Sequence, residues 1–375
     1  MPKIIIASLG IPGVLSATEA ASQLTRAIRS HDRSYQNEDI VQLPLVDGGE
    51  GTIDVLVTQT LGSFLEVETT DAHAGECVVP LGFAGEDGKL AIIEMKRAAG
   101  VDKAGDSGTT YGIGELIRDV LDEGAFSVLL GLDEPMACDA GLGAAAALGV
   151  KFFDAAGTPI EMNRGDAAIS KIARVNASAR SFELLSSRFF IGVTRAALQT
   201  VPSAPLIAEL ERLSEIILRD CNIHASTNDL TASAAAYGFR AFLGAEVQDG
   251  GQLVLDAARI EERMTETKTL LLFVNGTEQL EQENVRRLLD AAKKYGNKVV
   301  LLFARSLRAG PFEKGVAFDA IHSLADVQLF QPSLRADSGA EEVRRDLLMR
   351  IEKIMPEIAA ELRPKPASKR HSERA

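Results

Sequence analysis

Apolar positions follow two patterns along the chain. Short continuous apolar runs predict buried β-strands, whereas apolar positions three and four apart predict amphipathic helices. The predicted strands cover residues 3–7, 39–45, 65–69, 90–93, 126–131, 270–274, 299–303 and the neighbourhood of Ile321. The predicted helices cover residues 17–28, 53–61, 113–121, 140–148, 206–218, 230–243, 285–292 and 343–362.

Local signals mark several boundaries of these elements. Ser16 followed by Glu19 predicts a capping box at the start of the first helix. The run Glu-Asp-Gly-Lys at residues 86–89 is typical of a hairpin turn between two strands. Residues 188–204 carry no informative pattern.

The order of elements predicts an α/β fold with a discontinuous domain. Strands and helices alternate at both chain ends, and the stretch from residue 64 to 94 changes to short strands with a period of two. We therefore expect one domain from residues 1–65 and 266–362, with a second α/β domain of residues 66–265 inserted. The basic, apolar-poor residues 363–375 predict a disordered, solvated tail, although such a tail could also bind an anionic partner.

Composition narrows the class of protein. The 375 residues are 46% hydrophobic and 25% charged, which is ordinary for a soluble globular chain. A net charge of −13 argues against general nucleic-acid binding. No signal peptide or apolar run of membrane-spanning length is found, so we expect a cytoplasmic protein without a membrane partner. The three cysteines and five histidines show no metal-ligand spacing, and the oligomeric state does not follow from the sequence.

Residues 46–52, Val-Asp-Gly-Gly-Glu-Gly-Thr, form the first candidate site. The stretch links a predicted strand to a predicted helix, where open α/β sheets bind ligands. Its glycines allow a ligand to approach the backbone, and the carboxylates of Asp47 and Glu50 lie where helix amides lack partners. An alternative is that Asp47 only caps the helix and the glycines only make the turn.

A second candidate site is the helix start at residues 108–115. Thr109 or Thr110 is the predicted N-cap, and the small residues around it could bind an anion through free amides. A plain capped helix, with Thr109 and Glu115 in structural roles, is the alternative.

Five motifs in order make the chain resemble the type I glycerate kinases, which phosphorylate glycerate with ATP and magnesium. The motifs are residues 46–52 (family pattern DGGEGT), 93–95, 109–117, 139–150 and 241–245. The resemblance implies a Rossmann- or flavodoxin-like parallel-sheet domain formed by both chain ends, with a second α/β domain inserted. It also implies a small hydroxy-acid substrate, with Mg²⁺ and ATP as cofactors.

The resemblance also implies roles for individual residues. Asp47 and Asp139 would bind magnesium or activate the glycerate hydroxyl. The residues implied in binding substrate or phosphate are Gly48, Gly49, Glu50, Gly51, Glu94, Thr109, Thr110 and Tyr111.

The chain departs from the family pattern at the loops expected to hold phosphate. The first loop, family pattern PDSFKGS, reads Ser-Leu-Gly-Ile-Pro-Gly-Val at residues 8–14 and lacks both charges. The family's GGSATND segment reads Asp-Glu-Pro-Met-Ala-Cys-Asp at residues 133–139, and proline has no amide to donate. Losing one such donor typically costs about 10²–10³ in rate. We therefore expect impaired kinase activity unless Lys96 and Arg97 supply the missing charge.

Three functions remain open from the sequence. The first is ATP-dependent glycerate phosphorylation. The second is a non-catalytic homologue that binds a small hydroxy acid or regulates a partner. The third is acid–base chemistry by paired carboxylates in the same cleft, without a nucleotide.

Overall fold

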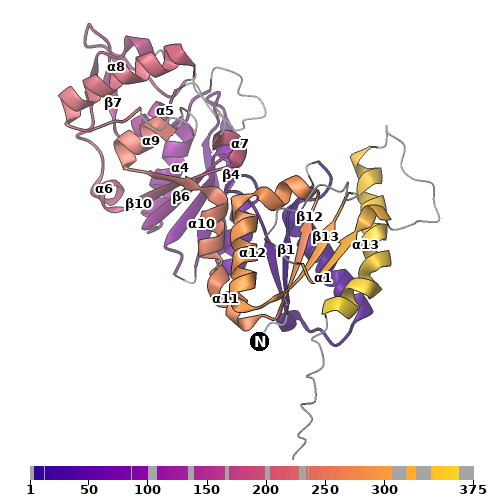
Figure 1. Cartoon of the computed structure of the whole chain (residues 1–375). Coiled ribbons are helices and arrows are strands. Elements are labelled where there is room, and N and C mark those ends of the chain that lie inside the picture. Colours follow the sequence, from indigo (N-terminus) through magenta and orange to yellow (C-terminus); the bar gives the residue numbers. More distant parts are fainter. Residues whose placement is uncertain are drawn as a thin grey trace, which may run out of the picture. The chain divides into compact units, whose positions relative to one another are not determined.

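The computed structural model describes residues 4–11, 13–85, 87–99, 108–133, 139–164, 169–198, 203–227, 234, 236–305, 318–326 and 339–362. Contacts within the chain divide it into two compact units. Unit 1 is Met1–Leu45 with Arg259–Ala375, and unit 2 is Val46–Ala258 (Figure 1). The domain boundaries at residues 65 and 265 stay predictions, and the predicted tail, residues 363–375, lies outside the described residues.

Unit 1 contains a five-stranded sheet in which every pairing is parallel. Its order is β14-β13-β12-β1-β2. β1, from the N-terminal part of the chain, therefore pairs with β12, from the C-terminal part. The strands are β1 (Ile4–Ser8), β2 (Ile40–Pro44), β12 (Thr269–Val274), β13 (Lys298–Phe303) and β14 (Ala320–Ser323). β1 and β12 are buried throughout, which explains their continuous apolar runs, since parallel strands are covered on both faces. The parallel sheet formed by both chain ends is confirmed.

Helices cover both faces of this sheet (Figure 1). α1 (Ala17–His31) and α13 (Ala340–Leu362) share one hydrophobic cluster with alternate residues of β1 and β12. α11 (Ile260–Glu266) and α12 (Glu283–Tyr295) lie on the opposite face. The predicted capping box of α1 is confirmed, because Glu19 N donates to Ser16 Oγ at 3.1 Å and Ser16 N donates to Glu19 Oε2 at 3.0 Å. Short 3-10 turns are Asn37–Asp39 (η1), Thr277–Glu281 (η5) and Leu324–Asp326 (η6).

Unit 2 contains a six-stranded sheet with the order β11-β10-β6-β5-β4-β3. β5, β6, β10 and β11 run parallel, whereas β4 is antiparallel to β5 and β3 is antiparallel to β4. The strands are β3 (Ser63–Thr70), β4 (Glu76–Ala84), β5 (Leu90–Glu94), β6 (Ser127–Leu132), β10 (Arg188–Val193) and β11 (Glu246–Asp249). β10 corrects the sequence analysis, because residues 188–193 carried no prediction and form a central strand of this sheet.

Two hydrophobic clusters lie on the two faces of the unit 2 sheet. On one face, α2 (Thr52–Thr60) and α10 (Gly250–Ala257) pack through Ile53, Leu56 and Val254. The other face is covered by α3 (Met95–Ala99), α4 (Tyr111–Asp122), α6 (Phe182–Ser186), α7 (Arg195–Leu198) and α9 (Ala236–Leu243). The predicted apolar stripe of α4 is fully used in this second cluster. Together these elements form the predicted second α/β body.

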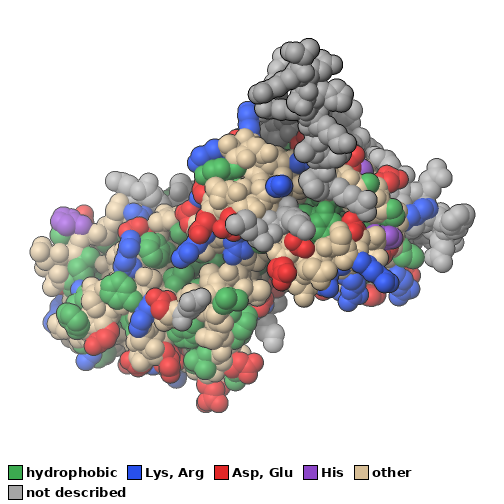
Figure 2. Space-filling model, turned by 90° about the horizontal axis from the view of Figure 1, so that it is seen from below, with side chains coloured by type: hydrophobic (Ala, Val, Ile, Leu, Met, Phe, Trp, Pro, Cys, Tyr) green, Lys and Arg blue, Asp and Glu red, His purple; other side chains and the backbone are tan. Residues whose placement is uncertain are grey.

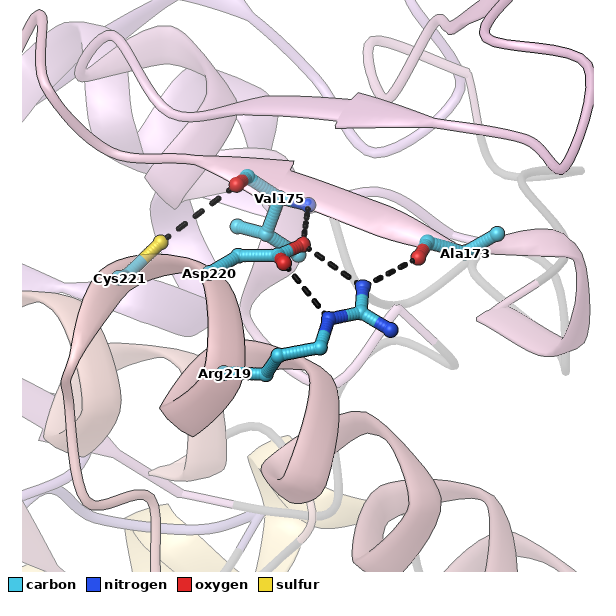
Figure 3. Close-up of polar contacts among 5 residues, drawn as sticks. All are labelled: Ala173, Val175, Arg219, Asp220 and Cys221. Carbon is cyan, nitrogen blue, oxygen red and sulfur yellow. Dashed lines mark hydrogen bonds and ion pairs between the residues drawn. The ribbon is translucent and has the colours of Figure 1, made fainter.

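A smaller lobe of unit 2 has its own core. It contains the antiparallel sheet β8-β7-β9, made of Pro159–Ile160, Lys151–Phe153 and Arg174–Asn176. α5 (Leu142–Ala147) and α8 (Ala204–Cys221) pack on it together with α9. Figure 3 shows how the end of α8 is tied to β9: Asp220 Oδ2 accepts from Val175 N at 2.9 Å, and Arg219 donates both to Asp220 and to Ala173 O.

Replacing Asp220 by alanine is expected to lower the free energy of unfolding by about 1–2 kcal/mol at pH 7, because the buried Val175 amide loses its acceptor. The Arg219 hydrogen bond lowers the pKa of Asp220, so this contribution is complete above the pKa of the unfolded chain and is lost as the pH falls through the lower, folded value. Urea unfolding at several pH values tests this. Glu211→Ala, at an exposed position of α8, is the control, and an equal loss there would contradict the prediction.

On the face drawn in Figure 2, acidic and basic side chains are interspersed among hydrophobic ones. In the part of the chain that the structure describes, no helix combines the length and the apolar character needed to span a bilayer.

Candidate active site

The 46–52 turn needs glycine at two positions. Gly48 and Gly51 have φ angles of 95° and 88°, in the left-handed region that residues with a Cβ rarely adopt. Gly51 is the N-cap of α2 and offers no capping side chain. The glycines therefore shape this turn, as the sequence predicts for a strand-to-helix switch.

The turn packs closely on the ends of three strands. A Cβ on Gly49 would lie 2.9 Å from Asp133 Cγ and 2.8 Å from Thr194 Cγ2, just after β6 and β10. A Cβ on Gly250, just after β11, would lie 2.2 Å from Asp47 O. These contacts place the turn over the carboxyl ends of parallel strands, where open α/β sheets bind their ligands.

The carboxylates of Asp47 and Asp133 lie near each other at this edge. Asp47 is exposed on one side, yet its carboxyl group is partly enclosed by the turn and the strand ends. Burial and the neighbouring charge of Asp133 raise the pKa of Asp47, while hydrogen bonds from backbone amides, including that of Arg195, oppose this rise. Lys96 Nζ lies 4.0 Å from Asp133 Oδ2, so a cation borders the pair. A carboxylate with a raised pKa beside a second acid is suited to accept a proton or to share a divalent cation.

Glu94, at the end of β5, caps α2. Its side chain is buried, and Oε1 accepts from Ile53 N at 2.8 Å, a residue 41 positions away. A carboxylate at a helix N-terminus also interacts favourably with the helix dipole. The alternative in which Asp47 caps this helix is therefore wrong. Burial raises the pKa of Glu94, while the Ile53 amide and Arg97, whose Nε lies 3.0 Å from Oε2, lower it.

A second group forms around Asp139. Its carboxylate is 3% exposed and accepts from the backbone amides of Thr110 at 2.7 Å, Gly141 at 3.0 Å and Gly143 at 3.1 Å. The hydroxyls of Thr110 and Thr109 lie 3.0 and 3.2 Å from Oδ2. Burial raises the pKa of Asp139, while these donors lower it. The carboxylate therefore joins the starts of α4 and α5.

The hydrogen bonds around Asp139 engage the hydroxyls of Thr109 and Thr110. Thr110 is the N-cap of α4 by position, but its hydroxyl accepts from Ala144 N of α5 instead of from its own helix. Thr109 is buried, and its Oγ1 also lies 2.7 Å from Met162 O. Tyr111 is half-buried, and Glu115 accepts from the Thr70 amide at 3.1 Å. These contacts support a positioning role for Asp139, Thr109 and Thr110 better than contact with a ligand.

Metal binding at the site would rest on few protein ligands. Among the described residues, no group of three or more His, Cys, Asp or Glu side chains is arranged to hold a metal ion. Mg²⁺ is commonly held by one or two carboxylates together with substrate phosphates and water. The Asp47–Asp133 pair fits that pattern, whereas Asp139 already has its oxygens occupied by protein donors.

The first loop of unit 1 is apolar in its packing as well as in its sequence. Leu9, Ile11 and Leu15 are buried, and Ile11 and Leu15 belong to the cluster beneath α1 and α13. Residues 134–138, where the sequence also departs from the family pattern, lie outside the described residues.

The comparisons with known proteins agree with this architecture. A model of the glycerate kinase family matches residues 4–193. The chain belongs to the glycerate kinase family. It is 28% identical over 385 residues to a glycerate kinase of Haemophilus influenzae, covering 92% of this chain and 98% of that protein. It is 27% identical over 330 residues to glycerate 2-kinase of Escherichia coli, covering 80% of this chain and 84% of that protein.

A solved structure supports the same fold. The crystal structure of a glycerate kinase 2 from Salmonella typhimurium LT2 matches with a TM-score of 0.76 and 24% sequence identity. The match covers 96% of this chain and 98% of that one. The family fold therefore extends over nearly the whole chain.

Three residues at the candidate site of this family member were missed from the sequence. Thr194 follows β10, Asp249 ends β11, and Gly250 comes next and contacts the 46–52 turn. The available signal was weak: a five-residue apolar run at Phe189–Val193 followed by a hydroxyl, and the Asp-Gly-Gly at 249–251. Predicting β10 would have placed Thr194 at a strand end.

The Asp47–Asp133 pair gives a pH test. Because Asp133 raises the pKa of Asp47, replacing Asp133 by asparagine lowers it, so ligand binding that needs ionised Asp47 persists to lower pH. Calorimetric binding of D-glycerate as a function of pH measures this shift. Asp122→Asn, at an exposed position of α4, should leave the profile unchanged, and an unshifted profile in Asp133→Asn would contradict the pairing.

Proposed function

We propose that this family member binds glycerate or a similar short hydroxy acid at the 46–52 turn and phosphorylates it with ATP, more slowly than its relatives. The observation that carries this proposal is the position of the turn over the carboxyl ends of β6, β10 and β11, with Asp47 and Glu50 exposed there. The relatives of E. coli and H. influenzae bear the names glycerate 2-kinase and glycerate kinase, which supports the substrate class.

Asp47 is the proposed general base. Burial and Asp133 raise the pKa of Asp47, and hydrogen bonds from backbone amides oppose this rise. The raised pKa suits Asp47 to accept the proton of a substrate hydroxyl. The amides of the glycine turn and Glu50 would orient the acid. Asp133 would hold Mg²⁺, which neutralises developing charge on the phosphates. Glu94 and Asp139 would act by holding α2 and α4 in place.

The loop at residues 8–14 is the reason for the proposed reduced rate of phosphoryl transfer. Leu9 is buried where the family pattern places its aspartate, and the sequence has Pro12 where the pattern places its lysine, so this loop offers no cation to a phosphate. Phosphoryl transfer depends on positioning and on charge around the moving group.

The test is an assay of ADP and phosphoglycerate formation from Mg-ATP and D-glycerate, with E. coli glycerate 2-kinase measured alongside. We expect glycerate-dependent turnover about 10²–10³ below that of the E. coli enzyme, and its loss in Asp47→Asn. Equal rates would contradict the impairment. Failure to bind glycerate would overturn the proposal.

A second function is favoured by the same buried loop. If glycerate binds without turnover and without Mg-ATP binding, the protein is a hydroxy-acid-binding homologue without kinase activity. The calorimetric titration of Mg-ATP, with and without D-glycerate, separates the two functions.

Lys96 is the residue best placed to replace the missing charge. Arg97 is already paired with Glu94 and lies 3.5 Å from Asp54, whereas Lys96 has one long contact, with Asp133, among the residues that the structure describes. We expect Lys96→Ala to weaken Mg-ATP binding about tenfold or more, and Lys96→Ala with Arg97→Ala to abolish it. Unchanged nucleotide binding in the double variant would rule out this compensation. Lys89→Ala, in the same unit, is the control.

A further inference from the structure

Unit 1 has a pocket that the proposed reaction does not use. It lies on the exposed side of α1 and the turn that leads to η1, and its volume is about 530 Å³. That volume falls within the range of small-molecule sites, about 300–1,000 Å³. Three arginines, Arg26, Arg29 and Arg33, line it together with hydroxyl and amide side chains.

The charge of the pocket contrasts with that of the chain. The whole protein has a net charge of −13, yet the described residues that line this pocket include three guanidinium groups and no carboxylate. The two nearest aspartates along the chain are engaged with backbone amides: Asp32 accepts from Ser34 N at 3.0 Å, and Asp39 accepts from Gln36 N at 2.9 Å.

The arginines are arranged to act together. Arg26 and Arg29, three residues apart, are neighbours on one side of α1, and Arg33, just beyond the end of the helix at His31, lines the same pocket. Arg29 donates to Asn37 Oδ1, which fixes its guanidinium at the wall of the pocket. Thr25 and Ser22, about one and two turns before Arg29, add hydroxyls that donate to Ala21 O and Gln42 Oε1 and can still accept a hydrogen bond. Several guanidinium groups around one pocket suit a phosphate better than a planar carboxylate, because a phosphate accepts hydrogen bonds from several directions.

We propose that this pocket binds a small phosphate-bearing metabolite, independently of the reaction proposed at the 46–52 turn. The guanidinium groups of Arg26, Arg29 and Arg33 contact its phosphate oxygens, and the hydroxyls of Ser22 and Thr25 contact its remaining polar groups.

The experiment is calorimetric titration of the full-length protein with pyrophosphate, with citrate as a polycarboxylate of comparable charge. We expect saturable pyrophosphate binding with a Kd of about 1 mM or below at physiological salt, and weaker citrate binding. Arg26→Ala with Arg33→Ala should weaken pyrophosphate binding about 100-fold, one factor of ten for each charged contact. Lys293→Ala with Arg345→Ala removes two exposed cations from α12 and α13 and should leave binding unchanged.

A second variant separates this pocket from a nucleotide site. Lys96→Ala should not alter pyrophosphate binding at the arginine pocket. Loss of binding in Lys96→Ala but not in the arginine variant would overturn the proposal, as would citrate binding as tight as pyrophosphate. Thermal unfolding of each variant checks that the fold is intact, and the single Arg33→Ala variant, with an expected tenfold effect, serves if the double variant is unstable.

Discussion

Asp139→Ala is expected to lower the free energy of unfolding by roughly 3–5 kcal/mol, among the largest effects of any single substitution in this chain. Three backbone amides, those of Thr110, Gly141 and Gly143, lose their acceptor inside the protein, and each unpaired buried amide costs about 1–3 kcal/mol before relaxation. Urea unfolding followed by far-ultraviolet circular dichroism measures the change, since the chain has no tryptophan.

Two further variants interpret that result. Asp139→Asn keeps one acceptor oxygen and should lose less stability than Asp139→Ala. Asp122→Ala, an exposed aspartate of α4, should change the free energy of unfolding by less than about 0.5 kcal/mol. If Asp139→Ala keeps its stability but loses all turnover, the positioning role is contradicted and the catalytic role predicted from the sequence is supported.

Gly250→Ala is expected to weaken D-glycerate binding about 10²-fold. The new Cβ would lie 2.2 Å from Asp47 O and 2.5 Å from Gly48 Cα, so the 46–52 turn must shift away from β11. A displacement of about 1 Å at a reacting group can cost about 10²-fold. The measurement is calorimetric binding, combined with turnover if the kinase assay is positive.

The matched control is Gly339→Ala, because a Cβ at Gly339 meets no atom within 4 Å. That variant should bind D-glycerate as the unaltered chain does. Unchanged binding in Gly250→Ala would show that the ligand does not depend on the geometry of the turn, and the proposed site would then be wrong.

Short local sequence patterns predicted much of the fold. The capping box of Ser16 and Glu19 depends on four consecutive residues, so the sequence is sufficient to predict it. β1 and β12 were predicted within one residue at each end, because strands buried on both faces need an unbroken apolar run. The hairpin near Gly88 was likewise readable, since β4 and β5 are antiparallel neighbours.

Contacts between distant segments could not be predicted in the same way. The sequence offered Glu94 as a binding residue, but its hydrogen bond to Ile53 exists only because β5 ends beside the start of α2. Asp139 was a candidate catalyst by motif, and only the positions of Gly141, Gly143 and Thr110 around it reveal how its oxygens are used. β10 was missed because Gly192, a residue type depleted in strands, lies within the apolar run of Arg188–Val193.

The cap that Glu94 provides for α2 constrains the order in which unit 2 can fold. An isolated α2 begins at a glycine that offers no capping side chain, and a helix of nine residues is marginal on its own. Its cap arrives only when β5 has joined the sheet, because the two partners are 41 residues apart. The 46–52 turn therefore acquires its final conformation after the central strands have paired, and amide exchange at Ile53 should become slow no earlier than exchange in β5.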